Sequence, residues 1–316
     1  MSTPEPKDVL SPLQGRLLIL LAAILWSLNG FFNTVLRQPT FLNLDVPEVK
    51  PLHIAFYRVL FAGLVLVPSL RRQDISWKWA MIFPAVAFAI MNISFVTAMA
   101  LRSVASALFL QYTAPVWMYL VCVFWWKEPT DRRSLLTVLM ALVGVVVIVV
   151  GGWQDDQLWI CLLAVNSGIF YAAVLLGLRV LSRESARWLT VVNFLSAALV
   201  LLPAIFFIAP PTWPQLGCLV VFGAVQLAIP YWFMARGLRS VSPQEAGMLT
   251  LVEPLLSPLW AYLTATYKKP PELTEWIGGA FILGALAWRY APLGKRGRQG
   301  EGEPGRAKDS RPLAEE

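Results

Sequence analysis

The fold of this chain is decided by two nearly identical stretches, Ala100-Leu101-Arg102-Ser103-Val104 and Gly237-Leu238-Arg239-Ser240-Val241. A second pair of similar stretches precedes the first pair, one member in each half: Leu64-Val65-Leu66-Val67-Pro68 corresponds to Leu199-Val200-Leu201-Leu202-Pro203. The offset between partners is the same for both pairs to within two residues. A constant offset of this kind indicates an internal repeat.

Each copy of the repeat holds five apolar stretches. The chain is 57% hydrophobic and only 14% charged, which argues against a soluble domain and for a protein embedded in lipid. A bilayer core needs about 20 apolar residues in helical form. Ten stretches qualify, approximately 17–36, 52–70, 78–100, 104–126, 134–151, 158–178, 187–208, 215–235, 243–266 and 273–291. An odd number of crossings per copy inverts the second copy, so we predict an all-α membrane protein of ten transmembrane helices built as two inverted five-helix repeats.

The lysines and arginines of the loops predict how the chain is oriented. If the N-terminus is cytoplasmic, most of them fall on the cytoplasmic side, and the outer side holds only Arg37, Lys50, Arg102, Lys268 and Lys269. Arg102 and Arg239 then lie on opposite sides, as an inverted repeat requires. We therefore expect a cytoplasmic N-terminal tail (1–16), repeat 1 (17–151), repeat 2 (158–291) and a disordered cytoplasmic tail (292–316). The first stretch lacks a signal-peptide cleavage site, and no transit peptide or retrieval signal is evident, which favours a bacterial plasma membrane.

Several short motifs resemble those of a known family. They are Leu25-Trp26-Ser27-Leu28-Asn29, Phe56-Tyr57-Arg58-Val59-Leu60, Tyr112-Thr113-Ala114-Pro115-Val116, Lys127-Glu128-Pro129-Thr130, Leu251-Val252-Glu253-Pro254 and Pro271-Glu272-Leu273-Thr274. Together they resemble the repeat unit of EamA-type members of the drug/metabolite transporter superfamily, and the resemblance covers about residues 17–291. It implies two five-helix halves around a central pathway that moves small organic solutes.

Two charged residues fall at membrane depth, where such residues are rare and are functional candidates. Arg58 lies six residues into the second stretch, about 9 Å below the outer surface, and Glu253 lies near mid-membrane in the ninth. We predict that Glu253 carries a proton or meets a cationic group, and that Arg58 holds a carboxylate or phosphate of the solute or pairs with Glu253. The structural alternative is an ion pair or a snorkelling arginine that fixes two helices.

Polar and aromatic residues in the same stretches complete the predicted substrate site. Amides in hydrocarbon face either a pathway or a neighbouring helix, and aromatic rings stack on planar solutes or pack the bundle. The predicted substrate-binding residues are Arg58, Glu253, Asn29, Asn92, Gln111, Asn166, Trp26 and Tyr112. Pro115 and Pro254 fall at matched positions of the two repeats and are predicted either as hinges for alternating access or as static kinks.

These features predict a secondary transporter that moves small organic metabolites by alternating access. Export of amino acids or related compounds is the first expectation, from the family resemblance alone; import or exchange of sugars or nucleotide-linked solutes is the alternative. We expect a small-molecule substrate and a lipid bilayer as partners, with proton coupling and a homodimer left open. We expect no enzyme activity, cofactor, metal or nucleic acid, because the chain has one histidine and no phosphate-binding Gly-rich loop. A membrane-embedded enzyme and a non-transporting membrane protein stay open as alternatives of other classes.

Overall fold

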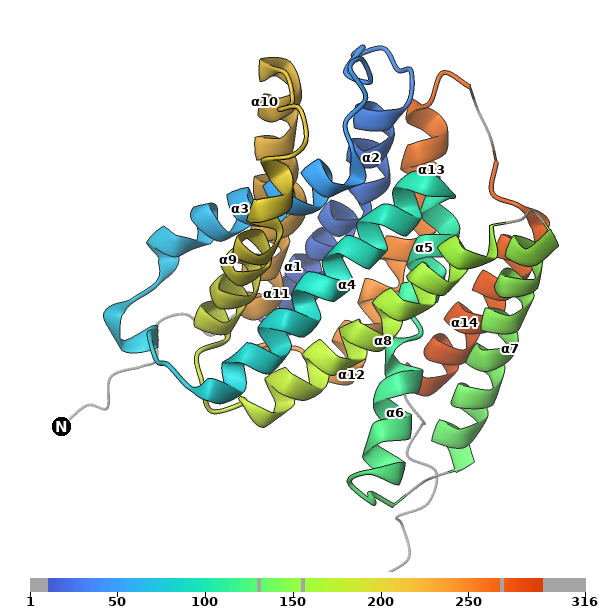
Figure 1. The fold of residues 1–316 in the computed structure, drawn as a ribbon. Coiled ribbons are helices and arrows are strands. Elements are labelled where there is room, and N and C mark those ends of the chain that lie inside the picture. Colours follow the sequence, from blue (N-terminus) through green and yellow to red (C-terminus); the bar gives the residue numbers. More distant parts are fainter. Residues whose placement is uncertain (1–10, 130–131, 155–156, 268–269, 292–316) are drawn as a thin grey trace, which may run out of the picture.

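The computed structural model describes residues 11–129, 132–154, 157–267 and 270–291, and within them the chain is helical with no β-strand. The predicted C-terminal tail and most of the N-terminal tail lie outside these residues. The helices are α1 (Pro12–Ser27), α2 (Asn29–Arg37), α3 (Pro51–Leu66), α4 (Ile82–Leu101), α5 (Val104–Gln111), α6 (Ala114–Phe124), α7 (Arg132–Gln154), α8 (Leu158–Val180), α9 (Ala186–Ile205), α10 (Trp213–Val221), α11 (Ile229–Gly237), α12 (Pro243–Thr250), α13 (Val252–Thr264) and α14 (Leu273–Tyr290) (Figure 1). Four short segments join them: the 3-10 turns η1 (Val67–Ser69), η2 (Arg72–Asp74) and η3 (Trp79–Met81), and the π-helical η4 (Phe222–Ala228).

The all-helical prediction is confirmed, but the count of apolar spans differs. Of the described residues, nine helical spans are long and apolar enough to cross a membrane, four of which join two or more of the helices above. The tenth predicted stretch corresponds to α14, which does not reach the same apolar composition. Its first turn holds Glu275 and its last turn Arg289, so the charges at both ends shorten its apolar part.

α14 nevertheless lies antiparallel along α7 over most of its length (Figure 1). At one end Arg133 of α7 donates hydrogen bonds to the backbone carbonyls of Trp288 and, at 2.7 Å, of Ala291. In the middle Gly278 faces Gly144, and their backbones touch because neither residue has a side chain. A helix that follows a spanning neighbour in this way shares its depth, so we treat α14 as the tenth crossing.

The close approach of α7 and α14 gives a stability prediction. A methyl group at Gly278 would overlap the Gly144 carbonyl, whereas one at Gly284 of the same helix meets open space. We expect Gly278→Ala to destabilise the fold by about 1–3 kcal/mol and Gly284→Ala to be neutral or slightly stabilising. Thermal melting of both variants in one detergent checks this. Equal melting temperatures for the two variants would show that the glycine contact does not hold the helices together.

The packing of the two halves (α1–α7 and α8–α14) follows an inverted repeat. α4 of the first half packs on α8 of the second, and the corresponding α11 of the second half packs on α1 of the first. The echoed turns behave in the same crossed way. Arg102 reaches Gln157 just before α8, while Gly237 and Ser240 lie against Gly15 at the start of α1. Each echoed turn therefore contacts the start of the other half, and we call the two ends of the bundle the Arg102 end and the Arg239 end.

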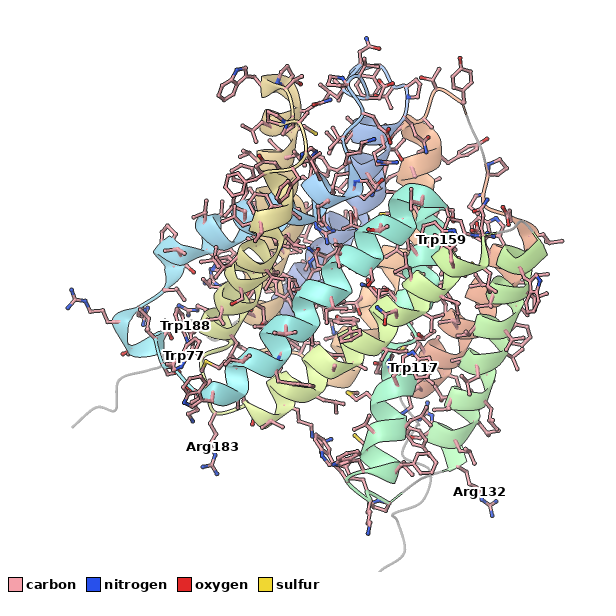
Figure 2. All side chains as sticks on the ribbon, viewed as in Figure 1. Trp77, Trp117, Arg132, Trp159, Arg183 and Trp188 are labelled. Carbon is pink, nitrogen blue, oxygen red and sulfur yellow. The ribbon has the colours of Figure 1, made fainter. Side chains whose placement is uncertain are left out.

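Basic and aromatic side chains mark the ends of the bundle. Arg132 and Arg183 point away from the bundle at its Arg239 end, and Trp159 lies towards the opposite end (Figure 2). At the Arg239 end the loop after α3 meets the turn after α8 and the first turn of α9, where Trp188 donates a hydrogen bond to the backbone carbonyl of Ser76. Arginine and tryptophan at such positions are typical of the interface between lipid and water.

An acid in this loop contact gives a pH prediction. Lys78 lies 2.5 Å from Glu184 and Ser76 donates a second hydrogen bond to it, and these contacts lower the pKa of Glu184. Because an unfolded glutamate has a pKa of about 4.3, the stabilisation is complete above that pH and is lost as the pH falls through the lower folded value. We expect the small difference in melting temperature between the wild type and Glu184→Gln to shrink as the pH drops below about 4. Melting at neutral and acidic pH checks this, and a difference that does not vary with pH would contradict it.

Candidate functional site

Three apolar spans are interrupted near their middles, and the interruptions lie next to the predicted site residues. The chain leaves regular helix at Leu28 between α1 and α2, at Tyr112 and Thr113 between α5 and α6, and at Leu251 between α12 and α13. Because an interrupted helix frees backbone groups, it is tolerated in a membrane only where other groups bind them or where it faces a cavity.

Side chains of α13 satisfy the first interruption. The Gly30 amide donates to the Ser257 hydroxyl at 3.0 Å, and the Trp260 indole donates to the Ser27 hydroxyl at 2.9 Å. These bonds join the first span to the ninth span, which belongs to the other half. The interruptions are therefore part of the contact between the halves.

Each of the two predicted hinge prolines lies just after one of the interruptions. Pro115 and Pro254 both lie in the first turn of the helix that follows, α6 and α13 respectively. Proline fits there because a first-turn amide has no partner within the helix. The chain breaks just before each proline, and a hinge role for the two residues stays a prediction.

Arg58 is the centre of a buried polar group that we call the arginine cluster, made of Arg58, Asn29 and Asn92. The arginine is 4% exposed and donates to Asn29 Oδ1 at 3.3 Å and to Asn92 Oδ1 at 2.5 Å. Asn92 in turn donates to the Ala55 carbonyl at 2.8 Å, which fixes the direction of its amide. The structure thus brings together three predicted site residues from α2, α3 and α4.

The π-helical segment η4 closes the arginine cluster from the second half. The guanidinium carbon of Arg58 lies 5.6 Å from the Phe222 ring and 5.9 Å from the Phe95 ring, within cation–π range. Gly223 lets η4 approach the Arg58 carbonyl, where a larger residue would collide. The sequence reasoning missed η4, because no composition signal marks a π-helix, although such segments often occur at functional sites.

Glu253 and Tyr112 form the second polar group, which we call the glutamate site. The Tyr112 hydroxyl donates to Glu253 Oε2 at 2.7 Å and lies 3.2 Å from the Thr250 carbonyl. The ion pairs of the described residues do not include one between Glu253 and Arg58, so the predicted alternative of a direct pair is not what this conformation shows.

The remaining predicted residues lie around these two groups. The Trp26 ring packs edge-on against Tyr231 with centroids 5.4 Å apart, and the Trp26 carbonyl accepts a hydrogen bond from Gln226 of η4 at 3.0 Å. Asn166 donates to the Ser94 hydroxyl at 2.9 Å and so links α8 to α4. Gln111 is half-buried at the end of α5 and belongs to neither group.

This arrangement combines a fixed positive charge, an acid and aromatic rings in the contact between the halves. Arg58 and Tyr112 come from the first half, and Glu253, Phe222 and Tyr231 come from the second. A guanidinium suits a carboxylate or phosphate, and a carboxyl group suits a proton or a cation. Such a site can hold an organic solute that has a charged group and an apolar or planar body.

Comparison with known proteins places the chain among transporters. The model of a family described as "EamA-like transporter family" matches residues 13–150 and again residues 158–290. A protein of Archaeoglobus fulgidus named as an uncharacterized transporter is 26% identical over 243 residues, which is 75% of this chain and 87% of that protein. A protein of Vibrio cholerae named as a riboflavin transporter is 24% identical over 293 residues, which is 88% of this chain and 93% of that protein.

A solved crystal structure shares the fold. It aligns with a TM-score of 0.61 at 18% sequence identity and covers 88% of this chain and 97% of the other. At this identity the likeness concerns the fold alone. The double family match and the crossed packing of α4 on α8 and α11 on α1 agree on two related halves.

Proposed function

The chain belongs to the EamA-like transporter family, and on that premise we propose that it moves small organic metabolites through alternating access to a site formed by the arginine cluster and the glutamate site. The observation that carries the proposal is Arg58, which is almost completely buried at membrane depth and is held by two asparagine oxygens rather than by an acid. Desolvating a charge costs several kcal/mol unless a partner or a function offsets it.

The preferred solute is a metabolite with a carboxylate, such as an amino acid or a related compound. Arg58 binds its anionic group, the rings of Trp26, Phe95 and Phe222 contact its body, and Glu253 exchanges a proton as the solute moves. Export is the preferred direction from the family resemblance alone. The distribution of loop cations fits a bacterial plasma membrane with both termini cytoplasmic and the Arg102 end outside.

The alternation follows from the inverted repeat. Because the halves are related by inversion, exchanging their conformations opens the site to the opposite side of the membrane. In the interrupted spans and in the π-helical η4 the backbone hydrogen bonds already depart from the regular helical pattern. These segments can therefore bend while losing few further hydrogen bonds.

The test is transport by the purified protein in liposomes. The panel comprises carboxylate-bearing metabolites, matched neutral solutes, sugars and riboflavin. Each labelled solute is added outside vesicles that are loaded with the same solute in unlabelled form. We expect saturable counterflow of at least one carboxylate-bearing solute and none in empty vesicles. Counterflow of neutral solutes alone would contradict the role of Arg58, and no counterflow of any solute would contradict transport of these classes.

A further inference from the structure

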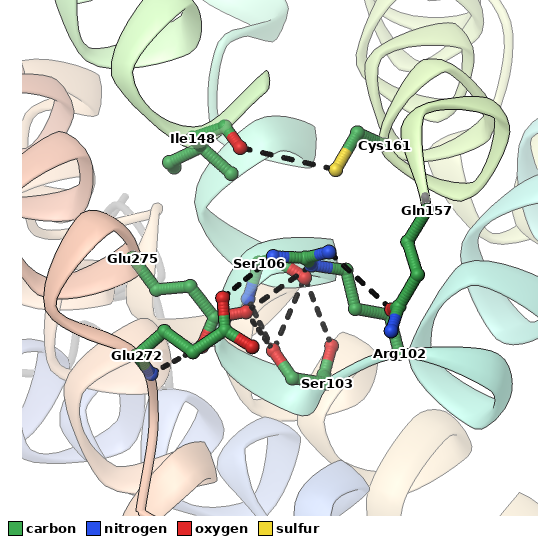
Figure 3. A network of polar contacts seen from close by, with 8 residues as sticks. All are labelled: Arg102, Ser103, Ser106, Ile148, Gln157, Cys161, Glu272 and Glu275. Carbon is green, nitrogen blue, oxygen red and sulfur yellow. Dashed lines mark hydrogen bonds and ion pairs between the residues drawn. The ribbon is translucent and has the colours of Figure 1, made fainter. Parts of the chain in front are cut away.

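A second buried charge network lies away from the proposed solute site, at the Arg102 end (Figure 3). Arg102 Nη2 lies 2.8 Å from Glu272 Oε2, its Nε lies 3.6 Å from Glu275 Oε1, and its Nη1 donates to Gln157 at 3.3 Å. The Ser103 hydroxyl donates to Glu275 Oε1 at 2.5 Å. The side chains of Arg102 and Glu275 are only 3% and 1% exposed.

This network joins the two halves of the protein. Arg102 and Ser103 form the turn between α4 and α5 of the first half, while Glu272 and Glu275 form the start of α14 in the second. α14 packs on α5 directly behind these contacts. A buried ion pair is strongly destabilised when one partner is removed, so the turn and α14 are held together as long as the charges stay paired.

Among the described residues, which do not include 130–131 just before α7, no equivalent network surrounds the turn of nearly the same sequence at the opposite end. Arg239 is exposed, and within the part of the chain that the structure describes the Ser240 hydroxyl donates to the Gly237 carbonyl of its own turn, at 3.4 Å. Within the described residues α7, which corresponds to α14, does not pack on α12 as α14 packs on α5. The ion pair nearby, Arg16–Glu245, is exposed at 51% and 39% and contributes little.

We propose that Arg102, Ser103, Glu272 and Glu275 form a latch that closes the Arg102 end of the solute pathway and must open before solute can pass on that side. The proposal rests on the proposed function. In alternating access each end of the bundle opens in turn, so a buried contact between the halves that closes one end must break when that end opens. The structure then holds the latch closed at the Arg102 end, and its described residues form no such contact at the Arg239 end.

The test measures the distance across the latch rather than transport. Cys122, Cys161 and Cys218 are replaced by alanine, and spin labels are attached at Leu101→Cys and Leu273→Cys, which are 42% and 73% exposed on either side of the network. In lipid nanodiscs we expect one short distance in this background. Glu275→Gln should raise the fraction of molecules with a longer label-to-label distance at least about tenfold. The substitution weakens the contact because it removes one of the two acids beside Arg102, while the ion pair between Arg102 and Glu272 remains.

Two further variants serve as controls for this test. The double variant Arg102→Gln/Glu275→Gln leaves no buried charge short of a partner at position 102 and should fold even if the single variant does not, with the same gain in longer distances. Glu245→Gln removes the exposed pair at the other end and should leave the Leu101–Leu273 distance unchanged.

The outcomes separate the latch from the proposed function. An unchanged distance distribution in both Glu275 variants would overturn the latch, even if the liposomes transport solute. Longer distances in these variants support the latch, even if no solute of the panel is carried and the proposed function fails.

Discussion

Replacing Arg58 by alanine is expected to raise the half-saturating concentration of a carboxylate-bearing solute at least about tenfold. A hydrogen bond between a charged donor and a carboxylate contributes about 1.5–3 kcal/mol, and Arg58 is the buried cation that the arginine cluster offers to the solute. Arg58→Lys should be intermediate, because an ammonium keeps the charge but lacks the planar fork of donors with which the guanidinium reaches both Asn29 and Asn92. Initial rates of uptake into liposomes over a range of solute concentrations measure the effect.

A matched variant in the second half controls for general damage. Asn193 is buried in α9 at the position that corresponds to Arg58 by the repeat offset, and Asn193→Ala should leave the half-saturating concentration unchanged. Melting temperature and yield are recorded for each variant. If Arg58→Ala lowers only the yield or the melting temperature and leaves the half-saturating concentration unchanged, the arginine is structural.

Replacing Glu253 by glutamine is expected to abolish the pH dependence of transport. Glutamine has nearly the same shape and its carbonyl oxygen can still accept the hydrogen bond from Tyr112, but it cannot take up or release a proton. Accumulation driven by an imposed proton gradient should fall to background, while exchange of solute at equal pH on both sides continues. The measurement is flux in liposomes with and without a pH difference.

Tyr112→Phe is the control for Glu253. It removes the hydrogen bond to the carboxylate but keeps the carboxylate itself, so pH-dependent flux should persist. Unchanged pH-dependent flux in Glu253→Gln would remove this residue from the mechanism. Lost flux in Glu253→Gln at every pH, with exchange also lost, would assign it to solute binding or structure instead of proton movement.

Much of the fold could be predicted because hydropathy and repetition act over whole spans. The echoed turns at Arg102 and Arg239 indicated an inverted repeat, and the family match over both halves and the packing of the helices are consistent with it. Local backbone irregularities could not be predicted. Pro115 and Pro254 suggested kinks but not their exact places: the chain breaks two or three residues before each proline, which itself lies in the first turn of the next helix.

The candidate site could be proposed from the sequence in its residues but not in its contacts. Arg58 and Glu253 could be singled out because the depth of a charged residue follows from its position along an apolar stretch. That Asn29 and Asn92 converge on Arg58, whereas Asn166 bonds Ser94, depends on how the helices rotate against one another, which the sequence does not encode locally. Arg102 was predicted only as a loop cation, and its burial against Glu275 arises from a contact more than a hundred residues away.

Topology mapping of the echoed turns tests the central claim most directly, namely that two inverted halves enclose the site. Leu101 and Leu238 occupy equal positions in the two echoes and are both 42% exposed, so each can be replaced by a single cysteine in the cysteine-free protein. In right-side-out vesicles a membrane-impermeant maleimide should label Leu101→Cys at once and Leu238→Cys only after the membrane is permeabilised. Labelling of both cysteines from the same side would contradict the account.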